Sequence, residues 1–204
     1  MTLINQFLLD KKVTFLNHGS FGACPIKIFN EYQSWQKKLE NQPVKFLDQY
    51  RDFGPNMTNV RKILSKKINC NSNNLAPVVN ATTGLNAIIK SIQFNKGDEV
   101  LISNHEYGAL EKTWQFIKTK YKIKINVVKV TLPLNSEDQF IHDFTKKFNN
   151  KTKILFLSHI TSPTALLFPI KKLIRLARQK KIITIIDGAH VPGHIDLNLN
   201  TLNA

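Results

Sequence analysis

The chain has 204 residues, of which 42% are hydrophobic and 21% charged, a composition that indicates a globular protein large enough to bury a core of its own. No apolar run is long enough to span a bilayer, and we expect no membrane partner. The two cysteines, Cys24 and Cys70, have neither metal-binding nor redox spacing, and we expect reduced thiols and a cytoplasmic location.

The formal net charge is +15, which raises the hypothesis of a non-catalytic basic module that binds nucleic acid or an acidic partner. The excess is spread along the chain as lysine pairs and forms no basic stripe interleaved with aromatic residues. These pairs are Lys11-Lys12, Lys37-Lys38, Lys66-Lys67, Lys146-Lys147, Lys171-Lys172 and Lys180-Lys181. We interpret them as solvated surface and expect no nucleic-acid partner, with the basic module as the alternative.

Helical and strand-like periodicities alternate along the chain, without an internal repeat. In chain order we expect helices at Pro25–Leu39, Met57–Ile68, Gly84–Phe94, Ala109–Thr119, Glu137–Phe148 and Ile170–Gln179. Between them we expect strands at Leu75–Val79, Glu99–Ser103, Ile123–Val130, Lys153–Ser158 and Ile182–Ile186. This alternation predicts an α/β fold with a mainly parallel sheet flanked by helices.

The strand at Ile182–Ile186 is the most informative of these elements. It is a continuous apolar run, the pattern of a strand buried on both faces, and it ends directly in Asp187 and a Gly-Ala-His turn. Open α/β sheets bind ligands outside the carboxyl ends of their strands. We therefore expect the carboxylate of Asp187 to have a functional role.

Three further strand ends carry polar or aromatic residues. The segment 80–84 precedes a helix and offers N–H groups and hydroxyls to a phosphate, or else Thr82 or Thr83 only caps that helix. The segment 103–108 is either a loop that stacks on a flat ring or an ordinary loop with a partly buried tyrosine. The segment 157–164 either offers hydroxyls to a ligand or forms a turn that begins at Ser-Pro. Together the four loops fit pyridoxal 5′-phosphate (PLP), which needs an anion site, a ring sandwich and an acid partner for its pyridine nitrogen.

Other site templates are absent from the sequence. There is no Gly-x-Gly-x-x-Gly motif, no Walker-type loop and no Gly-x-Ser-x-Gly elbow. His190 and His194 have the spacing of zinc ligands on a helix, but Pro192 and Gly193 lie between them and disfavour a helix there. We expect no metal site.

Five segments resemble motifs of the class V aminotransferases, which are PLP-dependent enzymes of fold type I, and within them the isopenicillin N epimerase-like branch. The segments are Phe15–Gly22 (FLNHGSFG), Asn80–Thr83 (NATT), His105–Ala109 (HEYGA), His159–Ala165 (HITSPTA) and Asp187–His194 (DGAHVPGH). They occur in the family's order and cover nearly the whole chain. The resemblance implies an N-terminal segment at 1–24, followed at 25–204 by an incomplete large PLP-binding domain.

The resemblance also implies roles for individual residues. Asp187 is expected to pair with the pyridine nitrogen of PLP and to keep it protonated. Ala81 and Thr82, with Thr83, are expected to hold the phosphate through backbone N–H groups and hydroxyls. Tyr107 is expected to stack on the ring.

Further residues are implied at the edge of this site. His105 is the alternative stacking residue, because related desulfurases use a histidine in this loop. Ser162 and His190 are expected near the phenolic oxygen of the cofactor, with His190 joining the aspartate as a catalytic residue. Asn17 and His18 are expected on the substrate side of the pocket.

In the family, the lysine that forms the Schiff base follows the aspartate, whereas no lysine follows Lys181 in this sequence. We therefore expect the sequence to be a fragment of a complete PLP-dependent enzyme, and this chain alone to be inactive. For the complete protein, the resemblance implies a homodimer that acts on an amino acid or a derivative. Epimerase, aminotransferase and lyase chemistry all remain open at this point.

Overall fold

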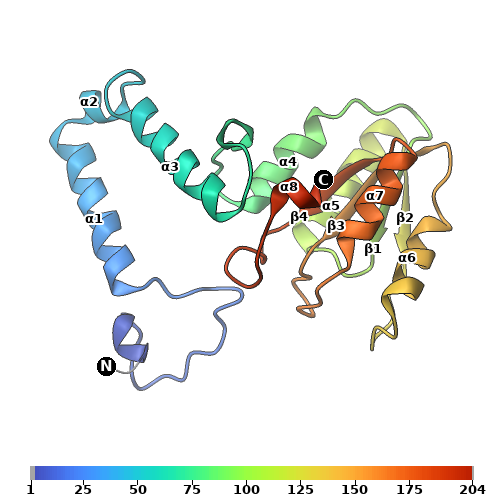
Figure 1. The fold of residues 1–204 in the computed structure, drawn as a ribbon, viewed down its shortest axis with the longest axis horizontal. Coiled ribbons are helices and arrows are strands. Elements are labelled where there is room, and N and C mark those ends of the chain that lie inside the picture. The colour runs from blue at the N-terminus through green and yellow to red at the C-terminus, as the bar shows by residue number, and fades with distance from the viewer. Residues whose placement is uncertain (1–2, 204) are drawn as a thin grey trace. The chain divides into compact units, whose positions relative to one another are not determined.

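The computed structural model describes residues 3–203. The chain divides into two units, and the division falls in the sequence between Leu64 and Ser65. The first unit contains a short 3-10 helix, η1, and three α-helices, of which α3 continues into the second unit (Figure 1). Their bounds are η1 Leu3–Gln6, α1 Ile26–Asn41, α2 Pro43–Leu47 and α3 Phe53–Lys67. The predicted division of the chain after residue 24 falls within this unit and stays a prediction.

The first unit has no core of its own, because no residue from 3 to 64 is buried. The helical spacing that predicts α1 is confirmed, but Ile28 and Tyr32 on that helix remain more than half exposed. Trp35 makes the main local contacts: its Nε1 donates to Glu31 Oε1 at 2.8 Å, and its ring packs edge-on against Phe46. The apolar face of α1 is therefore left largely uncovered within its own unit.

The second unit is a four-stranded parallel sheet in the order β2-β1-β3-β4, with helices on both faces (Figure 1). The strands are β1 Glu99–Ser103, β2 Lys124–Val128, β3 Thr152–Ser158 and β4 Ile183–Asp187. The helices are α4 Ala81–Ser91, α5 Gly108–Tyr121, α6 Glu137–Thr145, α7 Ile170–Gln179 and α8 Leu199–Leu202, with a 3-10 turn, η2, at Ser72–Asn74. The predicted α/β class and parallel sheet are confirmed.

Alternation along the strands divides the core into two clusters. Val100 and Phe156 point to the side covered by α4 and α5, where the fully buried Trp114 packs. Leu101 and Leu155 point to the other side, which α6 and α7 cover. Both faces of the inner strands are thus apolar, which is why β1 and β3 read as near-continuous apolar runs in the sequence.

The predicted strand at Leu75–Val79 is wrong. The segment belongs to no strand, and Val78 and Val79 are 54% and 90% exposed. A strand exists only where its backbone groups pair with a neighbour, and no strand among residues 3–203 pairs with this segment. Its apolar composition alone did not reveal this.

Parallel pairing brings the carboxyl ends of the strands to one edge of the sheet. Ser158 is the register partner of Asp187, and Ser103 is the partner of Val128. The loops that follow these residues therefore emerge side by side. No helix in the described part of the chain is long and apolar enough to cross a membrane.

Candidate functional site

A buried glutamate, Glu106, joins two strand ends at this edge. Its Oε2 atom accepts hydrogen bonds from the backbone N (2.8 Å) and Oγ (2.7 Å) of Ser158 at the end of β3. Its Oε1 atom accepts from the backbone N (3.3 Å) and Oγ (2.5 Å) of Ser103 at the end of β1. Burial raises the pKa of Glu106, and the four hydrogen bonds oppose that rise without cancelling it. We call this arrangement the glutamate clamp.

His105 is held in place by contacts with both neighbouring loops. Its Nε2 lies 3.0 Å from the carbonyl oxygen of Val130, which only accepts, so Nε2 is the donor. Its Nδ1 lies 3.3 Å from Thr164 Oγ1, which in turn lies 2.8 Å from Thr161 Oγ1. Leu166 N donates to that Thr161 hydroxyl at 2.9 Å. The ring of His105 is therefore part of a part-buried chain of hydrogen bonds.

Tyr107 differs from its neighbours, since its side chain is 45% exposed and makes no capping hydrogen bond. It precedes α5, whose backbone N–H groups at Leu110 and Glu111 bond to the Tyr107 carbonyl. The side chain of Tyr107, the expected stacking residue, is thus partly exposed at the carboxyl edge of the sheet. In the alternative residue, His105, both ring nitrogens are already in hydrogen bonds. Neither arrangement tests the predicted stacking, which stays a prediction.

The cap of α4 is Asn80, so the reading of Thr82 or Thr83 as the cap is wrong. Asn80 has an extended backbone, and its Oδ1 accepts from Thr83 N at 2.8 Å. Among residues 3–203, nothing accepts from the N–H groups of Ala81 and Thr82, and neither threonine hydroxyl is hydrogen-bonded. The helix therefore presents two free N–H donors and two free hydroxyls at its positive end.

Asp187 is 6% exposed at the last position of β4. Its Oδ1 accepts from Ala189 N at 2.9 Å, which closes the turn after the strand, and Oδ2 receives no hydrogen bond from any described residue. The Asp187 carbonyl accepts from His159 N at 2.9 Å. Burial lowers the pKa of the His159 imidazole below its ordinary value, which favours the neutral ring.

The remaining predicted residues are placed but not tested. Ser162 lies exposed in the loop after β3, and its hydroxyl has no partner among residues 3–203. The side chain of His190 is half-buried and likewise unpaired there, while its carbonyl oxygen lies 2.5 Å from Nδ1 of His194. Asn17 and His18 belong to the first unit, where Asn17 Oδ1 accepts from Ser20 N and His18 packs edge-on against Phe15.

No group of three or more His, Cys, Asp or Glu side chains within residues 3–203 is placed to hold a metal ion. The sequence reasoning overlooked the roles of Glu106 and Thr161, both buried and both hydrogen-bonded across loops. A usable signal was present: two buried strands, β1 and β3, each end in serine, and a single glutamate follows the first of them.

The sheet, the buried carboxylate at its carboxyl edge and the open helix N-terminus define an α/β domain of parallel type. The family model described as aminotransferase class-V matches residues 25–204. The chain belongs to this family, whose members are PLP-dependent enzymes.

Isopenicillin N epimerase of Amycolatopsis lactamdurans is 30% identical over 200 residues, which are 97% of this chain and 50% of that protein. Hercynylcysteine sulfoxide lyase of Schizosaccharomyces pombe is 27% identical over 195 residues, 95% of this chain and 49% of that protein. The chain thus spans about half the length of the curated relatives it matches. Among solved structures, mutant C-DES with glycine covalently linked to its PLP cofactor matches this chain with a TM-score of 0.88 at 20% sequence identity. The match covers 98% of this chain and 53% of the C-DES chain. This likeness confirms the fold.

Proposed function

We propose that residues 25–204 form the PLP-binding part of a class V aminotransferase-type enzyme that acts on an amino acid or a derivative. The observation that carries the proposal is Asp187, a carboxylate buried at the end of a parallel strand with one oxygen free of hydrogen bonds from described residues. Such a carboxylate favours a protonated ring nitrogen beside it. PLP, when bound, supplies an electron sink for the electron pair left on the amino acid's Cα.

The phosphate is assigned to the N-terminus of α4. The free N–H groups of Ala81 and Thr82 and the free hydroxyls of Thr82 and Thr83 match the donors that a phosphate dianion needs, and the helix dipole adds to the attraction. Tyr107 is assigned to the ring face, since its side chain is exposed. His105 is the weaker candidate, because stacking would have to leave its two hydrogen bonds intact.

Two further assignments concern the rim of the site. Ser162 and His190 have side chains without hydrogen-bond partners among residues 3–203, which supports a role for both at the phenolic oxygen. His190 would then hold or move a proton beside that oxygen. Asn17 and His18 are assigned to the substrate side.

The reaction is proposed for the whole protein. Relatives named as an isopenicillin N epimerase and a hercynylcysteine sulfoxide lyase support isomerase or lyase chemistry, and the family name adds aminotransfer. We further propose a cytoplasmic homodimer. The residues discussed above are assigned to cofactor binding and orientation.

The proposal is tested by binding of pyridoxamine 5′-phosphate to the 204-residue chain, followed by ligand fluorescence. This ligand carries the ring and phosphate of PLP but no aldehyde, so it does not condense with surface lysines. Asp187→Asn keeps an oxygen for Ala189 N but removes the charge, and we expect it to weaken binding at least about tenfold, or about 1.4 kcal/mol. Asp196→Asn, at an exposed carboxylate nearby in sequence, is the matched control and should bind like the wild type.

Pyridoxamine without the phosphate should bind at least about tenfold more weakly, because the donors at α4 then have no anion to hold. Absence of saturable binding by pyridoxamine 5′-phosphate contradicts the proposal. So does an Asp187→Asn variant that binds as tightly as the wild type.

A further inference from the structure

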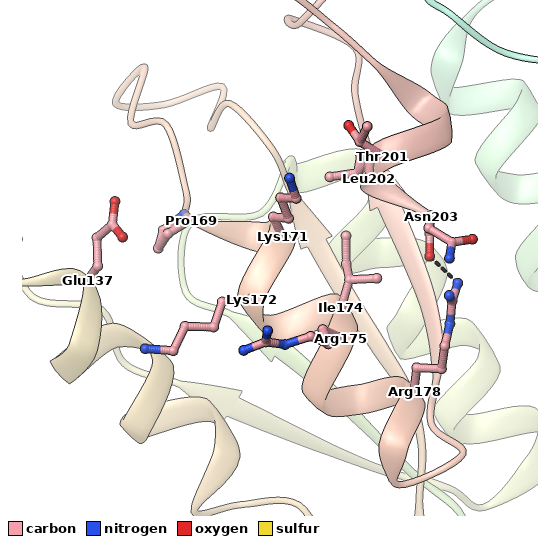
Figure 2. Close-up of a pocket in the computed structure, with 10 residues that line it drawn as sticks. All are labelled: Glu137, Pro169, Lys171, Lys172, Ile174, Arg175, Arg178, Thr201, Leu202 and Asn203. Carbon is pink, nitrogen blue, oxygen red and sulfur yellow. Dashed lines mark hydrogen bonds between the residues drawn. The ribbon is translucent and has the colours of Figure 1, made fainter.

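A cavity lies beside α7, apart from the residues of the proposed cofactor site. Its volume is about 590 Å³, and it is bounded by α7, by α8 with Asn203, and by the first residue of α6 (Figure 2). None of the residues assigned to PLP lines it. Leu173 and Ala177 form the buried face of α7, which packs on the sheet. The cavity lies beside that face: its lining combines polar side chains of α7 with Ile174, which itself belongs to the buried cluster.

Four cations line this cavity and only one carboxylate does. The cations are Lys171, Lys172, Arg175 and Arg178, all from α7, and the carboxylate is that of Glu137. Positions 171, 175 and 178 follow one another at helical spacing, so their side chains share one face of the helix. Figure 2 shows the four side chains spread around the cavity. Like charges at i, i+4 on one helix face disfavour each other, and an anion bound in the cavity would relieve that repulsion.

Two of the four cations already have partners. Lys172 Nζ forms an ion pair with Asp138 Oδ1 at 2.8 Å. The guanidinium of Arg178 donates to the carbonyl oxygen of Asn203, a contact that holds the wall formed by α8 against α7 (Figure 2). Lys171 and Arg175 form no hydrogen bond or ion pair with any residue in 3–203. One ammonium and one guanidinium are therefore available to a ligand.

The cavity also has an apolar part, supplied by Pro169, Ile174 and Leu202. An ordinary solvated lysine face lacks such a wall. A guanidinium matches the oxygens of a phosphate in a bidentate geometry, and an adjacent ammonium adds a point charge. A cavity of this volume, with both cations and apolar side chains in its lining, suits a small molecule with an anionic head and an apolar body.

We propose that this cavity binds a phosphorylated small molecule, with its phosphate between Lys171 and Arg175 and its apolar part against Pro169 and Leu202. The site is separate from the PLP site and stands whether or not PLP binds. It assigns a function to one of the lysine pairs that the sequence alone indicates to be solvated surface.

The test is titration calorimetry of the full 204-residue chain with pyrophosphate and with hexyl phosphate, at constant ionic strength. Lys171→Gln combined with Arg175→Gln should weaken binding of both ligands at least tenfold. Lys66→Gln combined with Lys67→Gln removes the same charge from an exposed pair elsewhere and should change binding less than twofold. Equal melting temperatures of both double variants and the wild type establish that folding is intact.

Hexyl phosphate should bind more tightly than inorganic phosphate, and Leu202→Ser should remove that advantage while leaving pyrophosphate binding unchanged. Duplex DNA serves as the competing probe. The proposal is overturned if the phosphates do not bind saturably, if the two double variants weaken binding equally, or if only DNA binding depends on Lys171 and Arg175. Binding unaffected by the Lys171/Arg175 variant places the anion elsewhere and overturns it as well.

Discussion

Oε2 of Glu106 lies 2.8 Å from the backbone N and 2.7 Å from Oγ of Ser158, although 52 residues separate the two in sequence. The same carboxylate holds Ser103 at the end of the adjacent strand. The two inner strands therefore end at a fixed separation, and the loops that carry Tyr107 and Ser162 start from that fixed point.

Replacing Glu106 by Gln should destabilise the second unit at pH 7. All four groups that face the carboxylate act as donors toward it, and the backbone N–H groups of Ser103 and Ser158 have no alternative role. An amide NH2 in place of one oxygen leaves at least one buried N–H unsatisfied, at about 1–3 kcal/mol. Urea unfolding measures the loss. Glu111→Gln, at an exposed glutamate on α5, should stay within about 0.5 kcal/mol of the wild type, and an equal loss in both variants would contradict a specific clamp.

The same variant should alter the pH dependence of stability. Burial raises the pKa of Glu106 above its ordinary value of 4.5, so the folded state binds this proton more tightly than the unfolded state. Between pH 4.5 and the raised pKa, the free energy of unfolding therefore falls as pH rises. Glu106→Gln lacks this decline, and its stability deficit relative to the wild type should shrink across that window. A deficit that grows with pH would contradict the sign of the shift.

At lower pH, Asp98 should make the free energy of unfolding rise as pH rises. Burial opposes the shift, but hydrogen bonds from Lys153 and Asn95 N, with the Lys153 charge, lower the pKa of Asp98 below 3.8. Its stabilising contribution is present above pH 3.8 and is lost as pH falls through the folded pKa. Asp98→Asn should therefore flatten the acid limb of a stability curve measured below pH 4. A limb identical to the wild type would show that the ion pair has no such effect.

Thr161→Val should destabilise the protein through the loop after β3. The Thr161 hydroxyl accepts from Leu166 N and contacts the hydroxyl of Thr164, which reaches His105. Valine keeps the volume but leaves a part-buried N–H unpaired, and we expect a loss of about 1–3 kcal/mol in thermal or urea unfolding. Thr119→Val, at an exposed position on α5, is the control. Similar losses in the two variants would mean that this chain of hydrogen bonds adds nothing.

Asn80→Ala should lower stability by about 1 kcal/mol, because the cap of α4 is lost. Asn73→Ala, at an exposed side chain without a hydrogen bond of its own, should change stability little. Because alanine also frees Thr83 N, pyridoxamine 5′-phosphate binding should persist if the helix still forms. Unchanged stability in Asn80→Ala would argue against its role as the cap.

Local sequence patterns predict much of this fold. The apolar runs at β1, β3 and β4 and the amphipathic pattern of α7 are visible within each segment, and the observed elements follow them closely. The segment at 75–79 has a similar apolar composition but does not form a strand, because no neighbouring strand pairs with it. Whether such a neighbour exists depends on the rest of the sheet and cannot be judged from the segment itself. The glutamate clamp could not be predicted for a related reason. It requires β1 and β3 to be neighbours in the sheet, and the sequence of neither strand determines the strand order.

Some site residues can likewise be predicted from their own segment, whereas others depend on contacts with distant segments. Asp187 follows from its place at the end of a buried run, which the sequence displays directly. Whether Asn80 or a threonine caps α4 depends on the backbone angle at one residue, and side-chain types alone do not fix it. Likewise, the difference between an engaged His105 and a free Tyr107 arises from Val130 and Thr164, which belong to other loops.

The strand that carries Asp187 has a single hydrogen-bonded neighbour in the described part of the chain, whereas β1 and β3 each have two. Its backbone amides on the open side should exchange with deuterium faster than those of the clamped strands, since opening the edge disrupts only one ladder. The proposed site therefore has a slowly exchanging side at Glu106 and a rapidly exchanging side at Asp187. A ligand that contacts Asp187 should slow exchange in β4 far more than in β1, so its binding would be coupled to the ordering of β4.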